Sequence, residues 1–142
     1  MNKFIVTAGA ALAVVVAAAI GTASVRADEA IHPVKTDGLK PLGTTWAKVN
    51  PYRGNKLAIK IGADAFNQNC ARCHGLEAIS GGIAPDLRFL PEGAEGDEWF
   101  AYRVQNGSVR DGRVYMPKMY PTLSQETLWA IRSWLDTVRQ DN

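Results

Sequence analysis

The sequence predicts an all-α protein in which three main helices are joined by long loops. Two segments, 57–70 and 124–140, carry apolar residues at steps of three and four, which is the spacing of one helix face. A third segment, 97–106, lies between signals for a helix start and a helix stop. The intervening segments 75–96 and 108–122 are predicted to be loops.

The first predicted helix has a glycine in the middle of its apolar face. Gly62 lies among Ala58, Ala65 and Phe66, and the segment leads directly into Cys70. Glycine inside a helix costs about 1 kcal/mol relative to alanine. We therefore expect a second helix to approach closely at Gly62.

The second predicted helix is defined by its ends. Asp97 and Glu98 suit a helix start, and Gly107 suits a helix end. These two acidic residues, together with Glu92 and Glu95, are interpreted as helix-start or solvent-exposed charges.

The final helix is predicted to begin after Ser124 and to extend to about Gln140. Ser124 is a suitable N-cap, and Glu126 is favourable in the first turn. Trp134 borders the apolar stripe and is predicted to fill the space beside Gly62. The stripe itself consists of Leu128, Ile131, Leu135 and Val138.

The first 27 residues resemble an export signal. Lys3 supplies a positive charge, the segment 4–20 is apolar and rich in alanine, and Val25-Arg26-Ala27 is a small-residue cleavage site. Retention of the segment as a membrane anchor is the alternative, because the apolar run approaches the length of a bilayer span. Both interpretations place the rest of the chain outside the cytoplasm, and cleavage after Ala27 is the one we favour.

The positive charge of the chain belongs to this leader. The chain has 16 Lys and Arg against 14 Asp and Glu, and the leader contains Lys3, Arg26 and no acidic residue. Its removal leaves 14 of each sign, so the sequence predicts no nucleic-acid partner.

We divide the exported chain into an irregular extension, 28–56, and one domain, 57–142. Proline and glycine interrupt any periodic pattern in the extension. Trp46 and Tyr52 indicate that the extension packs against the domain. His32 is interpreted as a solvent-exposed histidine.

The segment 70–74 reads Cys-Ala-Arg-Cys-His, a single C-x-x-C-H motif that is the attachment signature of a c-type haem. Cys70 and Cys73 would bond to the haem vinyl groups, and His74 would bind the iron as its proximal ligand. Thioredoxin-type dithiols and zinc sites also contain C-x-x-C pairs. A dithiol of that type needs a βαβ context, which the sequence does not show, and a closed zinc site needs four ligands. The motif therefore predicts one covalent haem c.

Three residues are candidates for the second axial ligand: Met116, Met119 and His32. Met116 is favoured because it lies in a loop between two predicted helices, and Pro117 stiffens the backbone there. Met119 is expected to pack at the haem edge. Ligation by His74 and a methionine raises the reduction potential and leaves no open position on the iron. This arrangement predicts an electron-transfer protein and not an enzyme.

The ligating imidazole also needs an orienting partner, because a metal-bound histidine usually donates its other N–H to an oxygen. Pro85, in the loop after the motif, is the predicted source of this carbonyl oxygen. Arg88 is a candidate partner for a haem propionate, since a guanidinium fork suits a carboxylate.

Taken together, these features resemble the class I cytochromes c over about residues 57–140. The resemblance implies that the first and last helices cross at the glycine and aromatic positions. The step from Met116 to Leu123 matches the family's spacing and favours Met116 over Met119. The matching features are Gly62 and Phe66, the CARCH motif, Pro85, Asn106-Gly107, Met116-Pro117, Leu123-Ser124 and Trp134.

More narrowly, the stretch NCARCHGLEAISGGIAPDLR (69–88) resembles the cytochromes c-550 that accept electrons from PQQ-dependent alcohol dehydrogenases. This resemblance implies a periplasmic, monomeric one-electron carrier. A quinoprotein alcohol dehydrogenase would be its donor, and a terminal oxidase or another cytochrome its acceptor. The alternative is a haem c subunit bound permanently in a periplasmic dehydrogenase or sulfur-oxidising complex. A haem sensor of carbon monoxide or nitric oxide is a third class.

Overall fold

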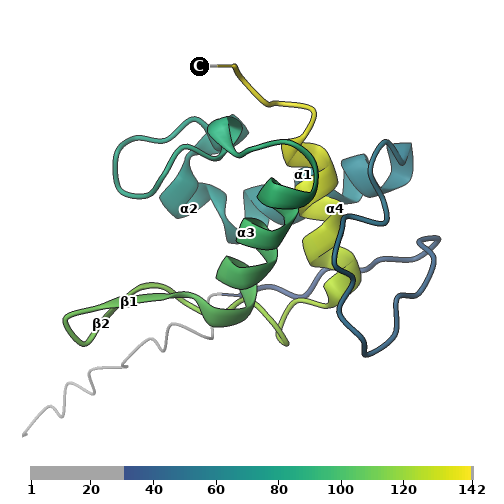
Figure 1. Ribbon diagram of the computed structural model, residues 1–142, viewed down its shortest axis with the longest axis horizontal. Coiled ribbons are helices and arrows are strands. Elements are labelled where there is room, and N and C mark those ends of the chain that lie inside the picture. Colours follow the sequence, from purple (N-terminus) through teal and green to yellow (C-terminus); the bar gives the residue numbers. More distant parts are fainter. Residues whose placement is uncertain (1–30, 142) are drawn as a thin grey trace, which may run out of the picture.

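The computed structural model describes residues 31–141 and contains four α-helices, two short 3-10 helices and one small antiparallel hairpin (Figure 1). The predicted leader, 1–27, lies outside the described residues. Within the described part of the chain, no helix is long and apolar enough to cross a membrane. Helices dominate, as the sequence predicted. The elements are α1 (Lys56–Asn69), α2 (Ala71–His74), η2 (Leu76–Ala78), η3 (Leu87–Phe89), α3 (Gly93–Asn106), β1 (Ser108–Arg110), β2 (Arg113–Met116) and α4 (Gln125–Leu135).

Helix α1 confirms the predicted first helix almost residue for residue. It begins after Asn55, whose side-chain oxygen accepts the backbone N–H groups of Leu57 and Ala58 at 2.9 and 3.1 Å. This cap satisfies donors that the first turn leaves without a partner. The buried face of the helix consists of Ala58, Gly62, Ala65, Phe66 and Asn69.

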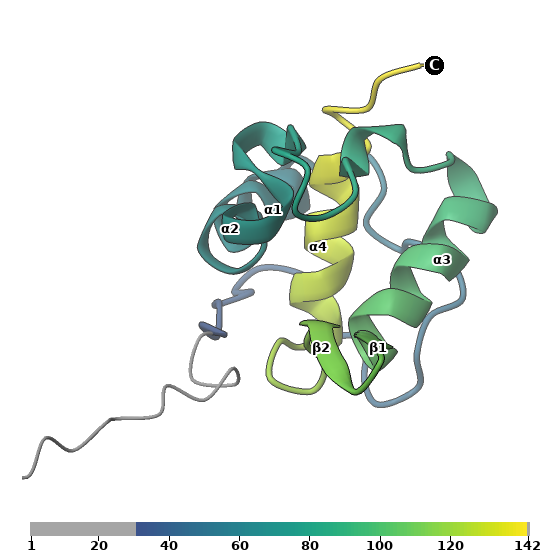
Figure 2. The same ribbon diagram turned by 90° about the vertical axis from the view of Figure 1, so that its left-hand side faces the viewer.

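Helices α1 and α4 cross at Gly62, and Figure 2 shows α4 running past α1 through the middle of the molecule. A Cβ atom on Gly62 would lie 2.0 Å from the backbone oxygen of Ala130, so only glycine permits this approach. The prediction that Trp134 fills the space beside Gly62 was wrong. Trp134 instead stacks on Phe66, with ring centroids 4.6 Å apart.

Helix α3 begins at Gly93, four residues before the predicted start at Asp97. Its first turn contains a second glycine, Gly96, on which a Cβ atom would lie 1.8 Å from the backbone oxygen of Pro91. The close passage of the preceding chain therefore explains this glycine in the first turn. Asp97 consequently lies inside the helix and not at its N-terminus.

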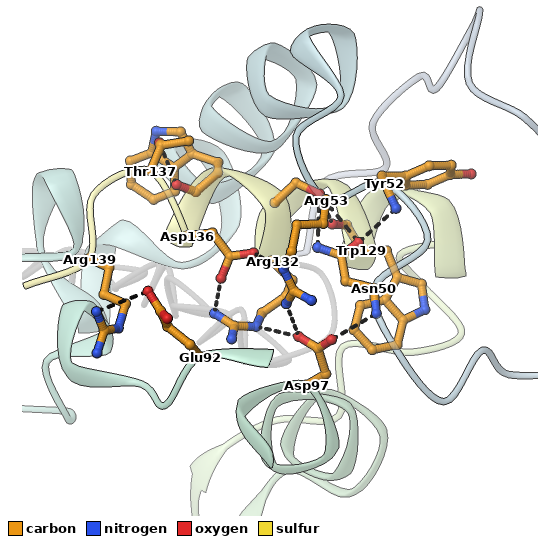
Figure 3. Close-up of polar contacts among 12 residues, drawn as sticks. Asn50, Tyr52, Arg53, Glu92, Asp97, Trp129, Arg132, Asp136, Thr137 and Arg139 are labelled. Atoms are coloured by element: carbon orange, nitrogen blue, oxygen red, sulfur yellow. Dashed lines mark hydrogen bonds and ion pairs between the residues drawn. The ribbon is translucent and has the colours of Figure 1, made fainter. Parts of the chain in front are cut away.

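Asp97 is fully buried, and its interpretation as a helix-start or solvent-exposed charge was wrong. Its Oδ1 accepts hydrogen bonds from Arg132 Nε at 2.9 Å and from Arg53 Nη2 at 2.7 Å (Figure 3). Its Oδ2 accepts the backbone N–H of Asn50 at 2.8 Å. Asp136 also pairs with both arginines, at 2.9 Å from Arg132 and 3.0 Å from Arg53. This ion network joins α3, α4 and the segment that precedes α1.

The segment 31–55 forms no helix or strand, yet it packs closely against the helices, as its aromatic residues predicted. The ring of Trp46 lies 5.2 Å from that of Tyr120 and 5.8 Å from that of Trp129. Tyr52 is buried and donates its hydroxyl to the backbone oxygen of Lys40. The segment 31–55 is thus part of the packed structure.

Part of the segment predicted as loop, 108–122, is a β-hairpin. Val109 pairs with Val114 and Arg110 with Arg113, and the turn is Asp111-Gly112 with positive φ at both residues. An Asp-Gly turn of this kind is a strong hairpin signal because both central positions require positive φ. The hairpin extends away from the helices at the lower left of Figure 1.

Helix α4 has the predicted start but ends early. Ser124 Oγ accepts the N–H of Thr127 at 3.2 Å, which confirms the predicted cap. The helix ends at Leu135 and not near Gln140. Beyond the end of α4, the N–H of Gln140 donates to the backbone oxygen of Arg88 at 2.9 Å. This hydrogen bond joins the C-terminal segment to η3 and is not compatible with a helix that continues to Gln140.

Replacement of Gly62 by alanine should destabilise the protein by about 2 kcal/mol or more, because backbone atoms cannot move aside as a side chain can. Gly81→Ala is the matched control, since a Cβ atom at this exposed glycine meets nothing within 4 Å. The measurement is the free energy of unfolding from guanidinium titrations followed by circular dichroism. Equal stability of the two variants would contradict the crossing at Gly62.

Asp97→Ala should cost about 3–5 kcal/mol, because it removes the fully buried carboxylate of the two that pair with the buried Arg132 guanidinium. The neighbouring Glu98→Ala removes an exposed carboxylate and should change stability by less than about 0.5 kcal/mol. Thermal unfolding of both variants provides the comparison. A Glu98 variant as unstable as the Asp97 variant would show that the buried network is not the cause.

Candidate haem site

A cavity of about 470 Å³ opens between α2, α3, α4 and the hairpin. All five predicted site residues line it: Cys70, Cys73, His74, Pro85 and Met116. The remaining wall is mainly apolar, because the core faces of four helices and loops meet there. Its apolar members include Phe66, Leu87, Phe100, Val104, Met119, Leu128 and Ile131.

The two cysteines and the histidine reach the cavity because α2 follows α1 without a loop. Cys70 caps the end of α1 and the start of α2, and its backbone oxygen accepts the N–H groups of Cys73 and His74 at 3.1 and 2.9 Å. Gly75 then turns the chain with a φ of +80°. A Cβ atom there would lie 1.8 Å from the backbone oxygen of Ile79, so the loop closes directly behind His74.

His74 is buried, and its ring is held in one orientation. Nδ1 lies 2.9 Å from the backbone oxygen of Pro85, as the sequence predicted. A carbonyl oxygen only accepts, so the proton of the neutral ring must reside on Nδ1. Nε2 is therefore the unprotonated nitrogen, which is the form that can bind a metal.

The loop that carries Pro85 is fixed by the next residue. Asp86 accepts the backbone N–H groups of Arg88 at 3.0 Å and of Ser80 at 3.3 Å. The Arg88 guanidinium donates to the same carboxylate, and these hydrogen bonds lower the pKa of Asp86 to about 2. Arg88, considered above as a partner for a propionate, thus pairs with Asp86 in this structure.

Cys70 does not have the property of a reactive thiol. Burial raises the pKa of the Cys70 thiol to about 12, and the nearby Cys73 adds to the shift. Thioredoxin-type chemistry instead needs a cysteine whose pKa is lowered. Within residues 31–141, no group of three or more His, Cys, Asp and Glu side chains is placed to hold a metal ion.

The end of α3 holds the methionine-bearing loop against the cavity. The backbone oxygen of Val104 accepts the N–H groups of Met119 and Tyr120 at 2.9 and 3.1 Å. Gly107 packs closely against the backbone of Met116. A Cβ atom on Gly107 would lie 2.4 Å from the Met116 backbone oxygen. Met116 is half-buried and Met119 is buried, and both line the cavity.

His32, the third candidate ligand, is exposed and does not line the cavity. Its backbone N–H donates to Asn69 Oδ1 at 2.6 Å, and its backbone oxygen accepts Asn69 Nδ2 at 3.1 Å. Among the lining residues that sequence reasoning missed are two with positive charge, Arg103 and Arg110. The Asp111-Gly112 turn is the signal that could have identified the hairpin bearing Arg110.

The lining fits a covalent haem c. Two thiols and an oriented imidazole lie on one side of an apolar cavity, and thioether sulfurs line the same space. This donor set, together with the apolar wall, is what such a cofactor requires.

Comparison with known proteins agrees with this chemistry. The family model described as cytochrome c oxidase, cbb3-type, subunit III matches residues 57–135. A cytochrome c550 of Pseudomonas aeruginosa is 66% identical over 112 residues, which cover 76% of this chain and 77% of that protein. The quinohemoprotein alcohol dehydrogenase ADH-IIG of Pseudomonas putida is 35% identical over 86 residues, covering 60% of this chain but only 11% of that enzyme. No solved structure matches.

The family match spans more than half of the chain, from α1 to the end of α4, and it includes the Cys-x-x-Cys-His segment. The identity to the cytochrome c550 extends over most of both proteins. The chain therefore belongs to this cytochrome c family: it is a class I c-type cytochrome, and thus an electron-transfer protein rather than an enzyme.

Proposed function

We propose that this protein is a periplasmic one-electron carrier with a single haem c, attached through Cys70 and Cys73 and ligated by His74 and Met116. The observation that carries the proposal is the convergence of these four residues on one apolar cavity. When bound, a haem supplies reversible one-electron chemistry. We further propose that α1, α3 and α4 are the three main helices of the class I fold.

In this proposal, each residue has a separate role. The cysteines form thioethers that keep the cofactor in place. His74 binds through Nε2, while its Nδ1–H, held by the Pro85 oxygen, prevents the ring from turning. The apolar wall excludes water from the site, which strengthens the fixed electrostatic interactions inside it.

Met116 is the proposed sulfur ligand and not Met119. Pro117 restricts the backbone conformation at Met116, and Gly107 packs against the backbone oxygen of Met116. Met119 is part of the buried core, and its backbone N–H donates to the backbone oxygen of Val104. With a methionine opposite His74, no position remains for a substrate, so only electrons would be exchanged.

The proposed donor is a PQQ-dependent alcohol dehydrogenase, and the proposed acceptor is a terminal oxidase or another cytochrome. Two relatives support a donor of this class, one described as a cytochrome c550 and the other as a quinohemoprotein alcohol dehydrogenase. We propose that the leader is cut after Ala27 and that the mature protein, with its extension (28–56) and domain (57–142), is a monomer. The alternative function is a haem subunit bound permanently in a dehydrogenase complex. The match to a small part of a quinohemoprotein alcohol dehydrogenase is the observation that supports this alternative.

The ferric protein should show the weak near-infrared absorption band that arises from sulfur-to-iron charge transfer. Met116→Ala should abolish this band, because it removes the proposed thioether ligand. Met119→Leu, which keeps the volume of a buried apolar side chain, should retain it. Loss of the band in the Met119 variant alone would assign the ligand to Met119 instead.

Reduction by a purified PQQ-dependent alcohol dehydrogenase with its alcohol substrate should be fast in stopped-flow experiments. The same dehydrogenase without its quinone is the control and should give no reduction. If the active enzyme fails to reduce a ferric protein that ascorbate reduces fully, the proposed donor is wrong. Co-purification with a dehydrogenase in a fixed ratio would instead support the subunit alternative.

A further inference from the structure

Positive charge collects around the cavity. Its lining includes three arginines, Arg72, Arg103 and Arg110, and no aspartate or glutamate. The described part of the chain carries acidic residues on several other surfaces, including Glu92, Glu95 and Glu98 on and beside α3. An apolar cavity with only cationic charges in its wall is suited to a ligand that carries carboxylates at one edge.

Arg110 is the one of these three cations that lies on the hairpin. It lies on β1, and its guanidinium carbon is 5.7 Å from the centre of the Tyr115 ring, which also lines the cavity. No ion pair among residues 31–141 includes Arg110 or its cross-strand partner Arg113. Arg113 does not line the cavity, so the two arginines of the hairpin differ in their relation to it.

The other two arginines are less well placed for such a ligand. The Arg103 guanidinium lies over the rings of Trp99 and Tyr102, at 5.4 and 5.6 Å, and Nη1 is 3.5 Å from the backbone oxygen of Gly107. Arg72 is part of the Cys-x-x-Cys-His segment itself and therefore lies at the thiol side of the cavity. Arg110 is the cation that lines the cavity from the hairpin.

The covalent structure of haem determines which of its edges would face the hairpin. Its vinyl groups and its two propionates lie at opposite edges of the porphyrin. Thioether bonds to Cys70 and Cys73 would fix the vinyl edge beside α2. The hairpin lies apart from α2 in both views, at another border of the cavity (Figures 1 and 2). The carboxylate edge would thus be directed towards the hairpin.

We propose that Arg110 binds a haem propionate and that the β1–β2 hairpin is the element that covers the carboxylate edge of the cofactor. This inference rests on the haem site proposed above. The planar guanidinium can donate two parallel hydrogen bonds to a carboxylate. Because β2 ends at Met116, the same contact would also fix the strand that carries the proposed sulfur ligand.

The test compares Arg110→Gln with Arg113→Gln in the haem-loaded protein. Both changes remove one exposed arginine from the hairpin, but only Arg110 lines the cavity. The first readout is the resonance Raman bending mode of the propionates, which reports hydrogen bonding to their carboxylates. We expect this mode to shift in Arg110→Gln and to stay unchanged in Arg113→Gln.

The second readout is the midpoint potential from spectroelectrochemistry. Loss of a cation beside the cofactor favours ferric iron, so Arg110→Gln should have a lower potential than Arg113→Gln. Identical Raman modes and potentials in the two variants would overturn the role of Arg110. That result would leave the carrier function intact, whereas absence of the sulfur-to-iron band in the wild-type protein would contradict the haem site itself.

Discussion

The contact between the backbones of α1 and α4 at Gly62 and Ala130 determines where the walls of the cavity lie. Because no side chain separates the helices there, Phe66 and Trp134 stack one turn further along, and Phe66 forms part of the cavity wall. The same helix ends next to Cys70, so the crossing also fixes the start of the Cys-x-x-Cys-His segment. Cores packed this closely tolerate little change in volume. The absence of one Cβ atom thus positions the residues that carry the chemistry.

The wall of the cavity formed by α3 and the methionine loop depends on charge as well as on apolar packing. Asp97 anchors α3 through Arg132 on α4 and Arg53 in the N-terminal segment. Further along α3, Val104 holds the loop of Met119, and both residues line the cavity. Apolar contacts are not directional, whereas a buried carboxylate must face its partners. The ion network therefore selects one orientation of α3, and that orientation places the methionine loop.

Helix boundaries set by neighbouring residues and the close helix approach at Gly62 could be predicted from the sequence, whereas the distant partners of a buried charge could not. The helix over 57–70 and the cap at Ser124 follow from local patterns, and both were confirmed. Asp97 was misinterpreted because its partners lie 35 and 44 residues away. Arg110 was missed because the local signal of Asp111-Gly112 was overlooked in favour of a loop. The structure brings the predicted site residues to a single cavity: Cys70, Cys73, His74, Pro85 and Met116.

Helix α4 shows most clearly why a sequence pattern can mislead. Its apolar stripe suggests one buried face, but almost every residue of the helix is buried. Several of its polar residues, unlike Arg132, face the irregular segment 31–55, whose backbone has no helix or sheet partners of its own. Glu126 accepts the N–H of Leu42 at 2.8 Å, Gln125 accepts that of Ala47 at 2.7 Å, and Ser133 bonds to the Asn50 side chain. Buried backbone groups require such partners. The polar side chains of α4 thus allow a segment without regular structure to complete the core.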